Sequence, residues 1–275
     1  MRAFAYTRPD TLEEAVALLD EYGTDARVLA GGTDLIIRLR DRTLTPTVVV
    51  DIKRIPELAP SIRRTDSVLR ISAGTTMTDV FEDAFVRAKF PALADAASII
   101  GSVQIRNRAT LVGNQCNASP AADTAPVLLV YGAALVMVGP SGERRVALDD
   151  FFVRSGVTAL QPGELVTAIE VPIPRLHEGS AFARRTRRRG HDLASVTMAV
   201  ALDSAGGTRL SYGSVGPRPV VFAAAGGEAP LEEWLARATP SPTSMRASPE
   251  YRLAMLRVLA ARATAVARQR LVEAV

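Results

Sequence analysis

The chain has very little cysteine, histidine or lysine. Among its 275 residues the only cysteine is Cys116, and the only histidines are His177 and His191. A single cysteine excludes an intramolecular disulfide and any four-cysteine zinc or iron–sulfur site within this chain. Two histidines are too few for most metal centres. We therefore expect no metal site here, so any cluster held by cysteine thiolates has to lie on another chain.

Long apolar runs are also missing. No stretch reaches the roughly 18 apolar residues that cross a bilayer, and the opening MRAFAYTRPDTLEEAVALLDEYG lacks the apolar core of a signal peptide. We therefore expect an unprocessed cytoplasmic protein with no membrane span. Hydrophobic residues make up 48% of the chain and charged residues 23%, which is typical of a globular protein. The length allows one large domain or two ordinary ones.

The positive charge of the chain comes almost entirely from arginine. The net charge is +4, and Lys53 and Lys89 are the only lysines. No nucleic-acid-binding motif accompanies this charge, so nucleic acid is not an expected partner. The run RRTRRR at 184–189 holds five arginines. It is either a solvated strand end and turn or a docking surface for an acidic partner subunit.

The first 55 or so residues predict a small βαβαβ-like unit. A helix begins after Asp10 and Thr11, either of which can serve as its N-cap, and a short strand at 27–30 follows it. A second helix begins at 35–39. The continuous β-branched run TVVVDI at 47–52 is typical of a strand buried on both faces.

The remainder of the chain has an α+β pattern that changes near residue 175. Before that point we expect edge-forming strands at 68–73 and 166–172, a hairpin of 133–138 with 144–148, and helices at 78–85 and 91–100. After Ile173-Pro174 we expect strands at 180–185, 194–203 and 208–214, with helices at 231–238 and 249–275. The sequence therefore predicts a second, smaller α+β domain, an antiparallel sheet packed with helices.

Two segments rich in small residues are candidates for ligand binding. In VLAGGTDL a strand ends in Gly31 and Gly32, and a helix follows. Glycine lets backbone N–H groups turn toward an anion, and Thr33 adds a hydroxyl. The alternative is an ordinary strand-to-helix turn capped by Thr33 or Asp34. The segment matches neither a Walker A loop nor a GxGxxG fingerprint.

The second segment, ATLVGNQCNASPAADT at 109–124, lacks the periodicity of an amphipathic helix. Thr110, Gly113 and Asn114 offer donors, and Asp123 offers an acceptor. The run also contains Leu111 and other apolar residues, so we interpret it as a buried loop that lines a ligand rather than a loop on the surface. Two donor-rich turns suit a diphosphate better than a single phosphate.

Four ordered motifs carry a resemblance to a known family. AGGTDL, IGSVQIRNRATLVGN, SPAAD and PGELVTAIEVPIP occur in this order between residues 30 and 174. Together they resemble the flavoprotein subunits of the molybdenum hydroxylases, which include the medium subunits of carbon monoxide dehydrogenase and the middle domain of xanthine dehydrogenase. The likeness extends to YGSVGPRPV and to the closing helix, so it covers essentially the whole chain.

The resemblance implies a domain organisation. Residues 1–175 are similar to a PCMH-type FAD-binding domain, with subdomains of about 1–55 and 56–175. Residues 176–275 are similar to the C-terminal flavoprotein domain of the carbon monoxide dehydrogenase type.

It also implies the residues that bind FAD. Ala30, Gly31, Gly32, Thr33 and Asp34 would hold the pyrophosphate from one side, and Thr110, Gly113 and Asn114 from the other. Asp123 would bond to FAD further along. Ile100 and Val166 occupy positions that contact the cofactor in the family, although both are apolar and an ordinary core role stays open for them.

The sequence departs from the family in two places. The second loop usually reads T-I-G-G-N, whereas Val112 replaces a glycine here. Either the backbone at this position avoids positive φ, or the pyrophosphate sits slightly differently. The family commonly has a lysine near the flavin on the strand after the domain boundary. The matching stretch here is Ala183-Arg184-Arg185, and we assign Arg185 as the residue that keeps a positive charge near the flavin ring.

By this resemblance the chain is the electron-transfer subunit of a molybdenum hydroxylase complex, and it needs no catalytic acid or base. Its FAD would receive electrons from a small subunit with two-iron clusters, after hydroxylation on a large molybdopterin subunit. The acceptor would be NAD, oxygen, a quinone or another molecule, and the family forms dimers of heterotrimers. Two alternatives stay open: a stand-alone FAD oxidoreductase, and a scaffold that has lost its flavin.

Overall fold

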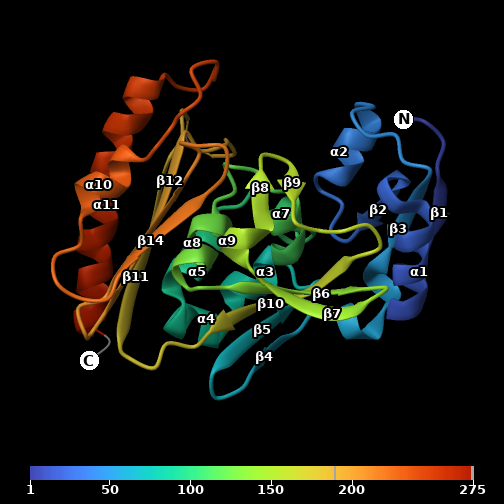
Figure 1. Cartoon of the computed structure of the whole chain (residues 1–275), viewed down its shortest axis with the longest axis horizontal. Coiled ribbons are helices and arrows are strands. Elements are labelled where there is room, and N and C mark those ends of the chain that lie inside the picture. Colours follow the sequence, from blue (N-terminus) through green and yellow to red (C-terminus); the bar gives the residue numbers. More distant parts are fainter. Residues whose placement is uncertain (189, 274–275) are drawn as a thin grey trace.

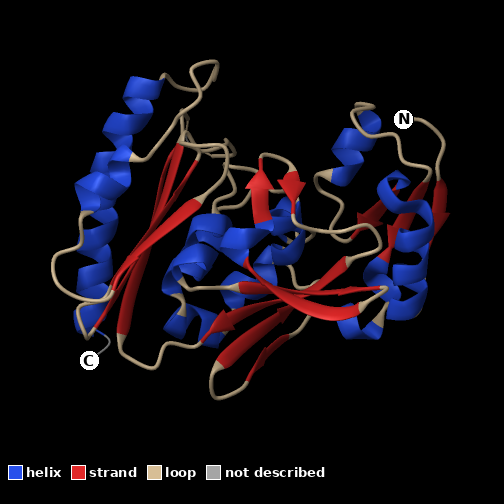
Figure 2. Cartoon of the chain, in the orientation of Figure 1, coloured by secondary structure: helices blue, strands red, loops and turns tan. Residues whose placement is uncertain are grey.

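A computed structural model describes residues 1–188 and 190–273 of the chain. Three main β-sheets follow one another along the long axis of the molecule (Figure 1). The N-terminus lies at one end beside the first sheet, and the last described residues, which end at Glu273, lie at the other end beside the last sheet. Helices separate the sheets or cover them (Figure 2). The α+β class predicted from the sequence is confirmed.

The first sheet is parallel and has the strand order β1–β3–β2. Its elements are β1 (Ala5–Thr7), α1 (Leu12–Tyr22), η1 (Gly23–Asp25), β2 (Ala26–Leu29), α2 (Leu35–Arg40) and β3 (Val48–Asp51). Thr11 caps α1 by accepting a hydrogen bond from the Glu14 amide. All four residues of β3 are buried, as the β-branched run predicted for a central strand.

The second sheet has five antiparallel strands in the order β4–β5–β10–β6–β7. Its strands are β4 (Ile62–Arg64), β5 (Val68–Ser72), β6 (Ala134–Gly139), β7 (Gly142–Ala147) and β10 (Leu165–Pro172). The predicted hairpin is confirmed as β6 and β7. The prediction of edge strands was wrong, because β5 pairs with β4 and β10 on its two sides and β10 is the central strand. The five consecutive buried residues that open β10 reflect this central position.

Short helices pack around this second sheet. They are η2 (Ile52–Arg54), η3 (Pro56–Leu58), α3 (Met77–Glu82), α4 (Ala84–Lys89), α5 (Pro91–Ser98), α6 (Val103–Arg106), α7 (Leu111–Cys116), α8 (Thr124–Val130) and α9 (Leu148–Phe151), and a small ribbon of β8 (Phe152–Arg154) and β9 (Val157–Thr158) follows α9. Every residue of α8 is buried. The first and second sheets share one large apolar core with these helices.

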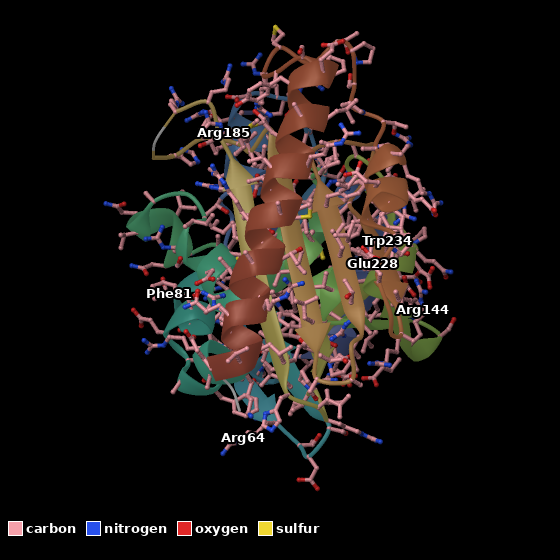
Figure 3. All side chains as sticks on the ribbon, turned by 90° about the vertical axis from the view of Figure 1, so that its left-hand side faces the viewer. Arg64, Phe81, Arg144, Arg185, Glu228 and Trp234 are labelled. Carbon is pink, nitrogen blue, oxygen red and sulfur yellow. The ribbon has the colours of Figure 1, made fainter. Side chains whose placement is uncertain are left out.

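The third sheet is antiparallel, with its strands in sequence order. It consists of β11 (Glu178–Arg185), β12 (Val196–Asp203), β13 (Thr208–Gly213) and β14 (Val220–Ala224), and it is followed by α10 (Leu231–Ala236) and α11 (Pro249–Glu273). The long helix α11 crosses one face of this sheet (Figure 3). The opposite face packs against α5 and α8. Both faces are therefore buried, each in its own apolar cluster.

Polar contacts tie the third sheet to the helices of the second. Tyr131 directly follows α8. Its hydroxyl forms a hydrogen bond of 2.5 Å with the Ser180 hydroxyl of β11, and both side chains are buried. Arg270 near the end of α11 donates to the Asp95 carboxylate of α5 at 2.9 Å. These bonds, together with the packing of α5 and α8, set the orientation of β11 toward the rest of the chain.

Candidate functional site

The first glycine-rich turn connects β2 to α2 and leaves its backbone donors free. The amides of Gly31, Gly32, Thr33 and Asp34 make no hydrogen bond to any residue in the described ranges 1–188 and 190–273. Gly32 has a φ of +77°, a conformation that glycine adopts without steric cost. Asp34 occupies the N-cap position of α2 but makes no side-chain capping bond. Consecutive unpaired amides of this kind form a site for an anion.

The two small-residue segments lie against each other. A Cβ added to Gly31 would collide with the backbone carbonyl oxygen of Arg108, so only glycine allows the two chains to approach this closely. Asn117, just after the second segment's helix, donates from its amide to the Asp34 carboxylate at 3.4 Å. The structure therefore brings residues 30–34 and 108–117 together, as one shared ligand would require.

Much of the second segment is helical, which corrects the interpretation of it as a loop. Residues Leu111–Cys116 form α7, and Thr110 caps this helix by accepting a hydrogen bond from the Gly113 amide at 3.0 Å. Val112 lies within α7, is 4% exposed and does not adopt a positive φ. Its replacement of the usual glycine therefore causes no backbone strain, in agreement with the first of the two expectations for this position.

Neighbouring side chains hold Asn114 in place. Its amide oxygen accepts hydrogen bonds from the Thr124 hydroxyl at 2.7 Å and from the Gln115 amide at 3.2 Å. Since these two bonds use the oxygen, the NH₂ group of Asn114 is the part that remains to donate. Gln115 and Thr124 are both fully buried, so the cluster is rigid and links α7 to the start of α8.

Asp123 is a buried acid with one unused oxygen. Its Oδ2 accepts a hydrogen bond from the Arg184 guanidinium at 2.7 Å. Its Oδ1 is buried and has no partner among the described residues, which is uncommon for a buried polar atom and indicates a missing partner. Burial raises the pKa of Asp123 to about 6, although the adjacent Arg184 acts in the opposite direction.

Arg184, rather than Arg185, faces this site. Successive residues of a strand point to opposite faces of the sheet, and Phe182 on the face of Arg184 packs against the large core. Arg185 points to the face covered by α11, where its Nε donates to the Tyr251 hydroxyl at 2.8 Å. The period-2 alternation of β11 puts Phe182 and Arg184 on one face and Arg185 on the other, and the packing of the sheet decides which face turns toward the large core.

The two remaining candidates, Ile100 and Val166, are apolar, and the single cysteine lies nearby in the sequence at the end of α7. Ile100 follows α5, is half-buried, and its carbonyl oxygen accepts from Arg106 at 3.1 Å. Val166 is 3% exposed in the central strand β10 and packs in the large core, which gives it a structural role in its own right. Burial raises the pKa of the Cys116 thiol to about 12, so this group stays protonated and unreactive at neutral pH.

These residues fit a dinucleotide. Four unpaired amides face a second segment that offers the Asn114 NH₂ group, and this arrangement suits the oxygens of a diphosphate. The unused Oδ1 of Asp123 suits a hydroxyl or ring N–H of the same ligand. Arg184 places a positive charge beside that acid.

Comparison with known proteins agrees with this fit. Residues 2–174 match the family model described as the FAD binding domain in molybdopterin dehydrogenase. The chain is 38% identical over 205 residues to the carbon monoxide dehydrogenase medium chain of Afipia carboxidovorans, covering 74% of this chain and 70% of the relative. It is 36% identical over 231 residues to the nicotinate dehydrogenase FAD-subunit of Eubacterium barkeri, covering 81% and 78%.

A solved structure matches over almost the entire chain. The reconstituted carbon monoxide dehydrogenase from Oligotropha carboxidovorans contains a chain that superposes with a TM-score of 0.91 at 32% identity, covering 98% of this chain and 99% of that one. The fold and these matches define the protein as a flavoprotein whose cofactor is FAD. The chain belongs to the family of FAD-binding subunits of the molybdopterin dehydrogenases, which are oxidoreductases.

Within residues 1–188 and 190–273, no group of histidine, cysteine, aspartate or glutamate side chains is arranged to hold a metal ion. In the same part of the chain, no helix is long and apolar enough to cross a membrane.

Proposed function

We propose that this chain is the FAD-carrying electron-transfer subunit of a molybdenum hydroxylase complex. The row of unpaired amides at Gly31–Asp34, held against the second donor segment, is the observation that carries the proposal. The names of two relatives support it, since one is a carbon monoxide dehydrogenase medium chain and the other a nicotinate dehydrogenase FAD-subunit.

In this proposal two groups of residues hold the diphosphate of FAD between them, and other residues contact the rest of the cofactor. Residues Ala30, Gly31, Gly32, Thr33 and Asp34 bind the diphosphate from one side, and Thr110, Gly113 and Asn114 support it from the other. Asp123 accepts a hydrogen bond from a cofactor hydroxyl or ring N–H through Oδ1. Ile100 contacts the cofactor, while Val166 acts through the core behind it.

Arg184 takes the role that the sequence assigned to Arg185. Its guanidinium lies beside Asp123 on the face of β11 that packs toward the FAD-binding residues. A fixed positive charge there stabilises a negatively charged reduced ring, because the electrostatic interaction is strong in a partly buried site. Arg185 points to the other face of β11, away from Asp123.

FAD, when bound, supplies the conversion between one-electron and two-electron transfer. The residues of this chain bind it, orient it and set the charge around its ring. We propose that the electrons come from two-iron clusters on a small subunit and ultimately from a molybdopterin large subunit. The single cysteine of this chain supports the assignment of those centres to other chains. NAD, oxygen and a quinone are the candidate acceptors, and a dimer of heterotrimers is the proposed assembly.

We also propose that the chain divides near residue 175. The family model ends at residue 174, and the apolar cluster around α11 is separate from the large core. Residues 1–175 would then form the FAD-binding domain, with subdomains of about 1–55 and 56–175. Residues 176–275 would form the C-terminal domain.

The first test is the visible absorption spectrum of the purified chain, with and without added FAD, followed by mass analysis of any released flavin. Flavin bands and release of intact FAD support the proposal. A colourless protein that does not take up FAD would favour the flavin-free scaffold. A flavinated chain that oxidises an organic substrate without a partner would favour the stand-alone oxidoreductase.

A further inference from the structure

A cavity lined mainly by polar and charged residues lies in the C-terminal part of the chain, apart from the two glycine-containing segments of the proposed FAD site. Its volume is about 280 Å³. Three arginines, Arg185, Arg187 and Arg246, contribute to its lining together with Ser195 and Tyr251. None of the FAD-binding residues proposed above lines it. Arg185, which the sequence assigned to the flavin, does line it, and its side chain is turned away from Asp123.

Three segments build this cavity. Arg185 and Arg187 come from the end of β11 and the turn after it, Ser195 immediately precedes β12, and Arg246 and Tyr251 flank the start of α11. Figure 3 places Arg185 beside the N-terminal end of α11, on the face of the sheet that this helix covers. The cavity and Asp123 therefore lie on opposite faces of β11.

The cavity has an excess of positive charge. None of its lining residues carries a carboxylate. Arg185 donates to a neutral phenol, the Tyr251 hydroxyl, and Arg187 Nε lies 3.8 Å from the Asp192 carboxylate, at the outer limit of an ion pair. Arg246 has no acidic partner among the described residues. Like charges gathered in a concave surface repel one another, and a bound anion removes this cost.

A buried hydroxyl supplies a second, independent observation. Ser195 is 1% exposed, and its hydroxyl has no hydrogen-bond partner among the described residues. The backbone of Ser195 is fixed on both sides, since its amide donates to Arg185 and its carbonyl oxygen accepts from Arg252 at 2.8 Å. Ser195 is among the residues that line the cavity, and a ligand that accepts hydrogen bonds would give this unpaired hydroxyl a partner.

We propose that this cavity binds a phosphate-bearing anion, in particular a diphosphate. Three guanidinium groups and a hydroxyl offer more donors than the two oxygens of a carboxylate accept, whereas a diphosphate has enough oxygens for all of them. Arginine forms paired hydrogen bonds with phosphate oxygens. The shared chemistry is the diphosphate group, which either a nucleoside diphosphate or free inorganic pyrophosphate supplies.

The test is calorimetric titration of the FAD-loaded full chain with inorganic pyrophosphate and, separately, with ADP. Loading with FAD occupies the diphosphate site at residues 30–34. The heat released on titration then measures binding at the arginine-lined cavity. We expect saturable binding of pyrophosphate, weakened at least about tenfold in the double variant Arg187→Gln/Arg246→Gln, because each change removes a charge-assisted contact with the phosphate oxygens. Both changed side chains are exposed, so the fold should tolerate them.

Arg262→Gln is the matched control, because it removes the same charge from an exposed position of α11 outside the cavity. Tighter binding of ADP than of pyrophosphate supports a nucleotide as the ligand, and equal or weaker binding of ADP supports free pyrophosphate. The proposal is overturned if pyrophosphate does not bind, or if Arg262→Gln weakens binding as much as the double variant. Titration of Gly32→Val, in which the first site is expected to be blocked, tests this cavity even if the FAD proposal fails.

Discussion

Asp123 and Arg184 are 61 positions apart in the chain, and their side chains nevertheless form a close ion pair of 2.7 Å. Only Oδ2 of the carboxylate takes part in this pair, and the buried Oδ1 has no hydrogen-bond donor among the described residues. Burial of a carboxylate oxygen without a hydrogen-bond partner is unfavourable. A donor group of a bound ligand would offset this cost, and two predictions for Asp123 follow from it.

The first prediction concerns the change Asp123→Ala. We expect FAD affinity to fall about tenfold, because a hydrogen bond to a charged acceptor contributes roughly 1.5–3 kcal/mol. Flavin fluorescence quenching, measured in a titration of the apoprotein with FAD, gives the dissociation constant. Asp149→Ala is the control, since Asp149 also pairs with an arginine, Arg218, but lies outside the proposed site. Unchanged FAD affinity in Asp123→Ala would remove this residue from the site.

The second prediction concerns pH. Burial raises the pKa of Asp123 to about 6 in the free chain, and a hydrogen bond from FAD to Oδ1 favours the ionised carboxylate and so lowers this pKa on binding. The affinity for FAD should therefore be highest at pH values above the pKa of the free chain. As the pH falls through it, the dissociation constant should rise by up to about tenfold per pH unit, until the pKa of the bound state is reached.

The same fluorescence titration, repeated across this pH range, measures the effect. Asp123→Asn keeps the size of the side chain but does not titrate, so its FAD affinity should lose this pH dependence. If the wild-type chain and Asp123→Asn respond to pH alike, another group causes the change.

At the scale of elements, the site depends on two short connections that meet, β2 to α2 and the stretch through α7. Neither is rigid by itself. The six-residue helix α7 is too short to be stable in isolation. Hydrogen bonds from the Leu111 amide to Thr75 and from the Met77 amide to Ala109 hold it against the start of α3. The amides of the first turn remain free because the turn is fixed from outside, by its contact with Arg108.

The prediction at this scale concerns Gly32→Val. Its φ of +77° is a strained conformation for a β-branched residue, and the added Cβ would come within 2.9 Å of Leu29 Cδ1. We expect the turn to rearrange and FAD to be lost during purification, which the ratio of flavin to protein absorbance measures.

Gly227→Val is the matched control. Gly227 has a similar φ of +75°, and a Cβ there would meet no atom within 4 Å. It should therefore incur the backbone strain, roughly 1–2 kcal/mol, and still retain FAD. A folded and fully flavinated Gly32→Val would show that this turn has only a structural role.

At the scale of the whole molecule, the third sheet has to dock on α5 and α8 before Arg184 can reach Asp123. The buried bond between Tyr131 and Ser180 lies in this contact. The phenol has no access to water, which raises the pKa of Tyr131 far above its ordinary value, so the hydroxyl stays protonated and available for the bond.

The prediction at this scale concerns Tyr131→Phe. We expect it to lower the free energy of unfolding by about 1–3 kcal/mol, because the Ser180 hydroxyl is left buried without a partner. Chemical denaturation followed by circular dichroism measures the change. Tyr22→Phe, at a half-buried tyrosine of α1 whose hydroxyl makes no hydrogen bond among the described residues, should stay within about 0.5 kcal/mol of the wild type. Equal effects of the two changes would mean that this bond adds nothing to the docking.

Local patterns in the sequence predicted much of this molecule correctly. The β-branched run of β3, the hairpin of β6 and β7, and the N-cap of α1 each depend on neighbouring residues, and each is confirmed. The four ordered motifs were sufficient to identify the family and its cofactor, which the comparisons confirm. The prediction that the first turn binds the diphosphate depends on a similarly local pattern, two glycines before a helix, and it stays a prediction.

Only the tertiary structure decided which strands lie at the centre of a sheet, whether α7 is a helix, and which of two adjacent arginines faces Asp123. The position of β10 depends on partners about 30 and 100 residues earlier in the chain, and α7 depends on the bonds that its segment makes to Thr75 and Met77. The choice of Arg184 depends on which face of β11 packs against α5 and the large core. These properties arise from contacts between distant segments, and the free energy of such contacts is not contained in the local sequence.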